Sequence, residues 1–198
     1  MATAKAEVLC DRRWTVEELD RWHAEQPERW ELILGVPVMM AQGSRRHTLI
    51  KTNIARHLGN KLAGTGCHFY VDGVEVKERN VDLSAVPDVV VECRPPDFST
   101  PEAVEPTVLV EVLSPSIERD DTGRKWRGYR LIPSLRHYLV VDQEERFVTV
   151  HTRTGRSSFA EDMVQEGAIE LTGLGVSLSL DEVYENVALP EPGPTGDA

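Results

Sequence analysis

The clearest pattern in the sequence lies in residues 108–142, which read VLVEVLSPSIERDDTGRKWRGYRLIPSLRHYLVVD. Val108–Leu113 is a continuous apolar run interrupted only by Glu111, as expected of a buried strand. After a Ser-Pro-Ser turn, a helix is predicted from residue 120 or 121 to about residue 131, where a proline closes it. His137–Val141 is a second apolar strand. The stretch therefore predicts a β-α-β unit with parallel strands and a right-handed crossover.

Two further helices are predicted upstream. Thr15 and Glu18 have the spacing of a capping box, which indicates a short helix starting at residue 16. Ser44 is positioned to cap a longer helix. Apolar residues recur every four positions in that helix, which predicts one buried face: Ile50, Ile54, Leu58 and Leu62.

Strand pairs are predicted where apolar runs flank tight turns. Asp72-Gly73 is a strong hairpin signal between Cys67–Val71 and Val74–Lys77. Pro37 places its strand at a sheet edge, because proline has no N–H to donate. Further strands are expected at 30–33, 36–40, 85–91, 146–152, 158–163 and 168–171, and a helical turn at 180–186. This order predicts a mixed β-sheet flanked by helices, an α/β or α+β fold.

Length and composition indicate one globular domain. The 198 residues are 40% hydrophobic and 28% charged, a typical mixture for such a domain, which we expect over residues 14–188. Residues 1–13 are predicted to be a flexible N-terminus, and residues 189–198 a disordered tail. The 22 Lys and Arg against 33 Asp and Glu give a net charge of −11. This balance argues against general coating of nucleic acid or an anionic membrane, and leaves room for a local basic groove.

The cysteines point to a reducing compartment. Cys10, Cys67 and Cys93 are odd in number and far apart, and no Cys-x-x-Cys pair is present. We therefore expect no zinc ribbon, no structural disulfide and a cytoplasmic protein. The first residues contain no apolar run that would indicate a signal peptide, and no segment approaches the ~18 apolar residues of a membrane span.

Two acidic residues interrupt apolar strands. Asp88 lies in Val86–Val91 and Glu111 in Val108–Leu113. A buried carboxylate is costly unless it is paired or binds a cation. If the two strands are neighbours, the two carboxylates need a shared proton or a metal, and carboxylates with water-filled open positions suit Mg²⁺ or Mn²⁺. The alternative is that each acid pairs with an arginine or lysine.

The helix after Glu111 supplies further polar groups. Asp121, Lys125 and Tyr129 are four residues apart and share one face. The strand-turn-helix connection brings this helix back across the sheet, so Lys125 could reach the two carboxylates and orient a water or stabilise a charged transition state. The alternative is a solvated Asp121–Lys125 ion pair worth a few tenths of a kcal/mol.

Several stretches, taken in order, resemble a known family. They are Glu31-Leu32-Ile33-Leu34-Gly35, His47 on a helix, Pro87-Asp88-Val89-Val90-Val91, Val110-Glu111-Val112-Leu113-Ser114-Pro115-Ser116, the trio Asp121, Lys125 and Tyr129, and His137-Tyr138-Leu139-Val140-Val141-Asp142. The pattern resembles the Uma-type restriction endonucleases of the PD-(D/E)-x-K nuclease superfamily, which have the restriction-endonuclease-like fold. The resemblance covers roughly residues 14–185.

The resemblance implies roles for individual residues. Asp88 and Glu111 would bind a divalent metal together with the backbone carbonyl of Val112. The superfamily lysine normally lies two residues after the second acid, where this chain has Leu113, and in the Uma-type pattern Lys125 takes its place.

It also implies a supporting set around those groups. Glu31 matches an acid close to the metal site, His47 would lie near the same cleft, and Tyr129 would support Lys125. The family often has Asp-Gly-Glu after Glu-Leu-Ile, but this chain has Leu34-Gly35-Val36, so one acid is absent.

We therefore expect a Mg²⁺-dependent endonuclease that hydrolyses phosphodiester bonds, with DNA as its substrate, Mn²⁺ as an alternative ion, and homodimerisation as a possibility. Arg45-Arg46 and the segment 124–130 are the basic clusters that could bind phosphates. One alternative is a catalytically silent nuclease fold that acts as a binding or regulatory protein, which the net charge favours slightly. Another is hydrolysis of a different phosphoester or nucleotide.

Overall fold

The computed structural model describes residues 12–40, 43–113 and 119–190, with the side chains of residues 119–121 left out. Its largest element is a six-stranded sheet with the order β10-β9-β8-β7-β6-β3. The strands are β3 (His68–Val71), β6 (Val89–Glu92), β7 (Pro106–Val112), β8 (His137–Val141), β9 (Val148–Arg153) and β10 (Phe159–Val164). All neighbours are antiparallel except β7 and β8.

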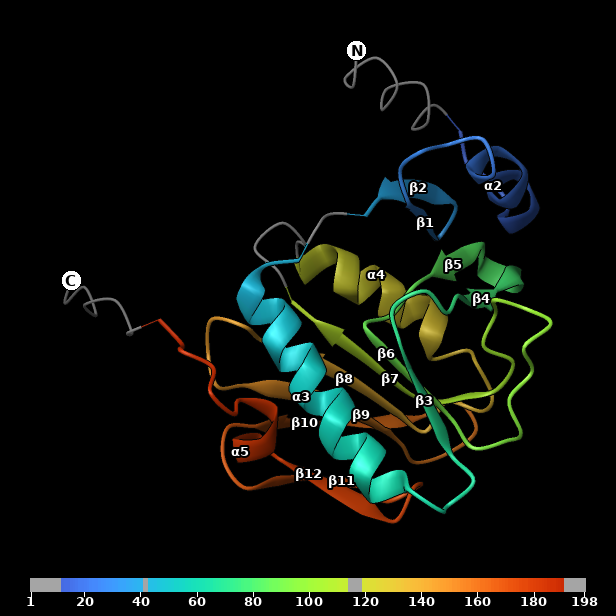
Figure 1. Ribbon diagram of the computed structural model, residues 1–198. Helices are drawn as coiled ribbons and strands as arrows, with labels where there is room; N and C mark the ends of the chain where they lie inside the picture. Colours follow the sequence, from blue (N-terminus) through green and yellow to red (C-terminus); the bar gives the residue numbers. More distant parts are fainter. Residues whose placement is uncertain (1–11, 41–42, 114–118, 191–198) are drawn as a thin grey trace.

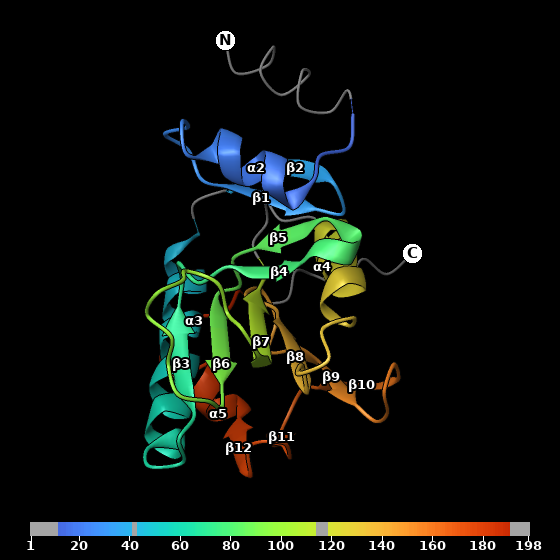
Figure 2. The same cartoon turned by 90° about the vertical axis from the view of Figure 1, so that its right-hand side faces the viewer.

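Two smaller sheets complete the strand content of the described residues. The first has the order β2-β1-β5-β4 and lies above the large sheet in Figure 2. Its strands are β1 (Trp30–Ile33), β2 (Val36–Met39), β4 (Val76–Glu78) and β5 (Leu83–Ala85), with the 3₁₀ turn η1 (Arg79–Val81) between the last two. The second is the antiparallel pair β11 (Ala168–Leu171) and β12 (Val176–Ser179).

Helices pack on both faces of the large sheet (Figures 1 and 2). On one face, α3 (Arg45–Leu62) and the short α5 (Leu180–Val183) bury their apolar residues against alternate side chains of β6, β7 and β8. On the other face, α4 (Arg119–Tyr129) and β4–β5 cover the remaining side chains of the same strands. Helix α2 (Val16–His23) packs on β1 in a separate apolar cluster. The predicted mixed sheet flanked by helices is thus confirmed.

The predicted β-α-β unit is confirmed as well. Strands β7 and β8 are parallel and in register from Val108 opposite His137 to Val112 opposite Val141, and α4 connects them. Several local signals behave as predicted: Thr15 and Glu18 form a capping box, Ser44 caps α3, and Pro37 lies on the edge strand β2.

The predicted hairpin around Asp72-Gly73 is wrong. Both residues adopt the positive φ angles of such a turn, but β3 pairs with β6 in the large sheet, whereas β4 pairs with β5 in the small sheet. The Asp72-Gly73 sequence determines the local turn, but the burial of apolar side chains determines which strands pair. The strand after the turn places Val76 in the core under α4, so the chain changes sheets at this turn.

The predicted single strand 85–91 is also wrong, because it is divided between the two sheets. Strand β5 ends at Ala85 and β6 begins at Val89. Pro87 has no N–H for a ladder, and the N–H of Val86 donates to the carboxylate of Glu31 at 2.8 Å. The break therefore releases Asp88 from the strand and leaves it just before β6. Strand β12 was not predicted.

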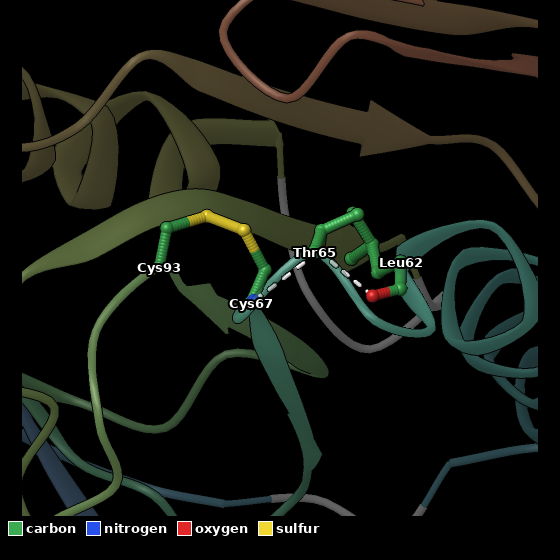
Figure 3. The surroundings of a disulfide bond; sticks show 4 residues. All are labelled: Leu62, Thr65, Cys67 and Cys93. Carbon is green, nitrogen blue, oxygen red and sulfur yellow. Dashed lines mark hydrogen bonds between the residues drawn. A yellow bond between two sulfur atoms is a disulfide. The ribbon is translucent and has the colours of Figure 1, made fainter.

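The expectation that the protein has no structural disulfide is wrong, because Cys67 and Cys93 form one. Cys67 immediately precedes β3 and Cys93 immediately follows β6, and His68 pairs with Glu92 in that antiparallel ladder. The ladder thus brings together two cysteines that are far apart in sequence. Figure 3 shows Thr65 beside the bridge, accepting the N–H of Cys67 and donating to the carbonyl of Leu62.

Three predicted segments fall on residues that the structure does not describe. These are the flexible N-terminus over residues 1–11, the tail over residues 191–198 and the turn over residues 114–116. Within the described ranges, no helix is both long enough and apolar enough to cross a membrane.

The disulfide predicts a redox-dependent stability. It closes a loop with a sequence separation of 26 residues, for which the loss of chain entropy in the unfolded state corresponds to about 3.5 kcal/mol. Cys93→Ser should lower the free energy of unfolding by about this amount in urea titrations, and a reductant should do the same to the wild type. Cys10→Ser is the control, because it keeps both cysteines of the bridge and should therefore keep the effect of the reductant. Equal stability of the oxidised wild type and Cys93→Ser would contradict the bridge.

Candidate active site

Asp88, which immediately precedes β6, lies opposite Glu111 of the neighbouring strand β7. Val89 pairs with Val110 between β6 and β7, so continuing the antiparallel register by one residue brings Asp88 opposite Glu111. The carboxylate Oδ2 of Asp88 accepts the backbone N–H of Val112 at 2.7 Å. The adjacency of these two strands, predicted from the sequence, is therefore confirmed, and the fold brings the two acids together.

Glu111 is buried among apolar strands and is held by two groups of α4. It is 6% exposed, and its Oε1 accepts hydrogen bonds from Lys125 Nζ at 3.1 Å and from the Tyr129 hydroxyl at 3.0 Å. Lys125 and Tyr129 are four residues apart, so both point from one face of the helix to the same oxygen. The structure thus brings both residues to the Glu111 carboxylate.

Glu31 joins this group from the small sheet. It lies in β1, is buried, and its carboxylate oxygens are both 3.0 Å from Lys125 Nζ. Its Oε1 also accepts the N–H of Val86 in the break between β5 and β6. Lys125 is therefore a buried ammonium between two carboxylates that come from different sheets.

Asp88 is held by α3. Its Oδ2 is 3.1 Å from Nε2 of His47, and its Oδ1 is 3.5 Å from Nζ of Lys51. The Ser44 hydroxyl accepts the N–H of His47 and so fixes the first turn of the helix. A side chain on Gly43 would come within 2.7 Å of the His47 ring, so the glycine leaves room for the ring in this position.

Lys51 was not predicted as a site residue. It lies one turn after His47 on α3 and also forms an ion pair with Asp72 at 2.9 Å. The spacing of four residues after His47 was an available signal, but the partner Asp88 comes from a distant strand, so nothing near Lys51 in the sequence marked it.

Burial and charge set the protonation of this cluster. Burial, together with the negative charges of Glu31 and Asp88, raises the pKa of Glu111 to about 7 although Lys125 opposes the shift. Burial disfavours the charged form of Lys125, but the two carboxylates outweigh it and hold its pKa above the ordinary value. For Asp88, the hydrogen bonds and charges of His47, Val112 and Lys51 overcome burial and lower the pKa.

Asp121 and the backbone carbonyl of Val112 are the two remaining predicted site groups. The Asp121 side chain lies outside the described residues, so its predicted supporting role and its ion pair with Lys125 stay predictions. The N–H of Val112 binds Asp88, whereas the role of its carbonyl oxygen as a metal ligand stays a prediction.

The donor chemistry of the cluster fits a hard divalent cation. Within the described ranges, no three His, Cys, Asp or Glu side chains are already gathered as a metal-binding group. Mg²⁺, however, is commonly held by one or two carboxylates and completes its shell with water and substrate phosphate. Asp88 and Glu111 supply two such carboxylates, and the pKa of Glu111 is raised first by burial and then by the negative charges of Glu31 and Asp88, against the opposing charge of Lys125. An additional cation would offset these negative charges.

A solved structure shares this architecture. A crystal structure from Anabaena variabilis, described as a "putative nuclease belonging to DUF820", superposes with a TM-score of 0.70. It is 16% identical, and the match covers 86% of this chain and 97% of that one. At this identity the likeness shows the fold, and it confirms the predicted fold class.

The family follows from the sequence match. The model of the Uma2 family, described as "Putative restriction endonuclease", matches residues 16–181. The chain therefore belongs to the Uma2 family, as the resemblance indicated.

Two proteins of Synechocystis sp. are similar over much of their length. "Uncharacterized protein slr1290" is 29% identical over 174 residues, which are 87% of this chain and 92% of that protein. "Uncharacterized protein sll1609" is 28% identical over 132 residues, which are 65% and 75% of the two chains.

Removing the Lys125 ammonium should destabilise the fold in a pH-dependent way. Lys125→Met leaves Glu31 and Glu111 buried without a counter-ion, which typically costs about 3–5 kcal/mol. The loss should be larger at pH 8 than at pH 5, because Glu111, with its pKa of about 7, is protonated at the lower pH and carries no charge there. Urea unfolding at both pH values measures it.

The double variant Lys125→Met with Glu111→Gln is the matched control for this prediction. It removes one negative charge together with the positive one, so it should regain most of the stability at pH 8. A single variant as stable as the wild type at pH 8 would show that the ammonium does not balance these carboxylates.

Proposed function

We propose that the protein is a Mg²⁺-dependent endonuclease that hydrolyses phosphodiester bonds in DNA. The observation that carries this proposal is the buried arrangement of Asp88 opposite Glu111, with Lys125 bonded to both Glu111 and Glu31. Membership of a family described as restriction endonucleases supports a nuclease, a hydrolase acting on phosphodiester bonds, and supports nucleic acid as the substrate.

Asp88 and Glu111 would hold the metal, with the carbonyl oxygen of Val112 as a further ligand. A bound divalent ion would supply Lewis-acid polarisation of a phosphate oxygen and of a water molecule. His47 orients the Asp88 carboxylate through its Nε2, and Tyr129 orients Glu111 through its hydroxyl. Both carboxylates are thus fixed in direction by groups from opposite faces of the sheet.

Lys125 would act on the charge of the reacting phosphate. Its ammonium is buried and its pKa is held above the ordinary value by the two carboxylates, so it is protonated at neutral pH. A positive charge held in a low-dielectric site stabilises negative charge that develops in a transition state more strongly than it does in water. Glu31 keeps this ammonium beside Glu111 through its own ion pair.

The overall charge of −11 does not favour attraction of a polyanion, so local cations would have to position the substrate. Lys51 lies beside Asp88, and Arg45, Arg127 and Arg130 are exposed at the ends of α3 and α4. Phosphate contacts of this kind fix the position of a duplex without reading its sequence. They would therefore give DNA binding that weakens steeply as salt increases.

Nicking of supercoiled plasmid tests the proposed activity. Wild type should nick in Mg²⁺ or Mn²⁺ and not in EDTA, and Lys125→Ala should lower the rate by about 10²–10³, the usual effect of removing one electrostatic stabiliser. Lys77→Ala is the matched control, because Lys77 is an equally buried ammonium among acids, Asp20, Glu75 and Glu102, outside the site. It should keep the wild-type rate wherever it is folded.

Two outcomes would contradict the proposal. Full activity of folded Lys125→Ala would remove the lysine from the mechanism. An inactive wild type that still binds DNA would favour the alternative of a silent nuclease fold that acts as a binding protein.

Metal binding has a readout that is independent of cleavage. If Asp88 and Glu111 hold the ion, Mg²⁺ or Mn²⁺ at 100 times its Kd should stabilise the fold by about 2.7 kcal/mol. Thermal melts of wild type and Asp88→Asn measure this effect. An equal shift in both proteins, or no shift in the wild type, would show that these carboxylates do not form the site.

A further inference from the structure

A cavity lies beside the candidate active site on the same face of the large sheet. Its volume is about 450 Å³, and it is bounded by β8, β9, β10 and the first turns of α4. Beyond α4, the strands β9 and β10 continue the sheet to the side (Figure 2). No function assigned above uses this cavity.

The strand register connects the cavity directly to Glu111. Glu111 pairs with Val140, Val140 with Thr149, and Thr149 with Met163. Side chains that are directly opposite in a ladder share one face of the sheet, so these four form a single row from the acid into the cavity. Neighbouring strands are about 4.8 Å apart, so the cavity floor begins one strand away from Glu111.

The next row of side chains is covered by α4. Tyr138 pairs with His151, and His151 with Glu161. The Trp126 ring stacks on His151 at 4.2 Å and on Tyr138 at 5.5 Å between ring centroids. This aromatic stack forms a rigid wall. It leaves the row of Val140, Thr149 and Met163 open, and Met163 is 68% exposed.

Tyr138 lies between the cavity and the candidate active site. It lines the cavity and is fully buried, and its hydroxyl has no hydrogen-bond partner within the described ranges. Its pKa is raised by burial and by the charges of Glu111, Glu31 and Asp88. A ligand in the cavity would therefore lie against the same ring that faces the carboxylates.

The cavity is lined by three carboxylates, beside the neutral polar side chains of Thr122, Thr149 and Gln165. The carboxylates are those of Asp142, Glu145 and Glu161. Burial lowers the pKa of His151, although the charge of Glu161 opposes the shift, and the His151 ring lies 3.4 Å from the Glu161 carboxylate. An acidic edge repels phosphate groups, but it accepts hydrogen bonds from amino groups. A flat ring with an amino group on its edge suits this cavity. The ring would pack on the apolar floor and the aromatic wall, and the amino group would donate to the carboxylates.

We propose that this cavity binds a nucleobase with an exocyclic amino group, from the nucleotide whose phosphate lies at Asp88 and Glu111. The inference rests on the proposed function and adds a base preference to it. Cytosine meets the requirement through N4, from which Glu and Asp side chains accept. Thymine presents a carbonyl oxygen at the equivalent position. Two acceptors would then face each other, and the carboxylates would repel this oxygen.

Binding of short oligonucleotides in Ca²⁺, a cation that carboxylate oxygens also bind, tests the proposal with a readout other than cleavage. Oligo-dC and oligo-dT of six nucleotides carry equal phosphate charge, so a difference in Kd comes from the bases. Wild type should bind oligo-dC about tenfold more tightly, the effect of one good base contact. Glu161→Gln should reduce this preference severalfold.

A blocking variant controls for the rest of the interface. Gly123 lines the cavity, and a Cβ added there meets no described atom within 4 Å. Gly123→Phe should fill the cavity and abolish the preference, whereas Gly123→Ala should keep it. Equal Kd values for the two oligonucleotides, no binding of either, or an undiminished preference in Gly123→Phe would overturn the proposal.

The outcomes of these experiments distinguish a failure of the base site from a failure of the proposed nuclease activity. A wild type that nicks plasmid but shows no base preference overturns the base site and keeps the proposed activity. A wild type that prefers oligo-dC but does not nick plasmid supports the base site and contradicts the activity.

Discussion

The site depends on the burial of one ammonium among more carboxylates than it can neutralise. Lys125 lies between Glu31 and Glu111, with Asp88 opposite, and the first three are all less than a tenth exposed. Such a cluster costs stability unless every oxygen has a partner. Tyr129 supplies the remaining donor to Glu111, and the N–H groups of the strand break and of β7 bind Glu31 and Asp88. The surplus negative charge is what makes the site suitable for a cation.

This constraint explains why the chain divides its strands between two sheets. A continuous strand from Ala85 to Val91 would use the N–H of Val86 in a ladder and fix Asp88 within the pleat. The break after Ala85 gives that N–H to Glu31 and lets Asp88 reach both the end of β7 and the first turns of α3. The small sheet then has a chemical role, because its β1 carries one of the two partners of Lys125.

Sequence reasoning succeeded where the signal was local or repeated. One acid in each apolar strand, the four-residue spacing of Lys125 and Tyr129, and the caps at Thr15 and Ser44 could all be seen within a few residues. It failed where a long-range partner decided the outcome. The Asp72-Gly73 turn formed, but burial of Val76 sent its second strand to another sheet. The Cys67–Cys93 bridge required the β3–β6 ladder, and Lys51 required Asp88 from a distant strand.

Helix α4 links the chemistry to the cavity. Lys125 and Trp126 are consecutive and so point about 100° apart around the helix, one to the carboxylates and the other onto His151 and Tyr138. The helix cannot turn to improve one contact without disturbing the other. Gly128 lets the helix approach β5, since a side chain there would meet Leu83 at 2.6 Å. The close packing of α4 on both sheets therefore sets the position of the ammonium and the shape of the neighbouring cavity at the same time.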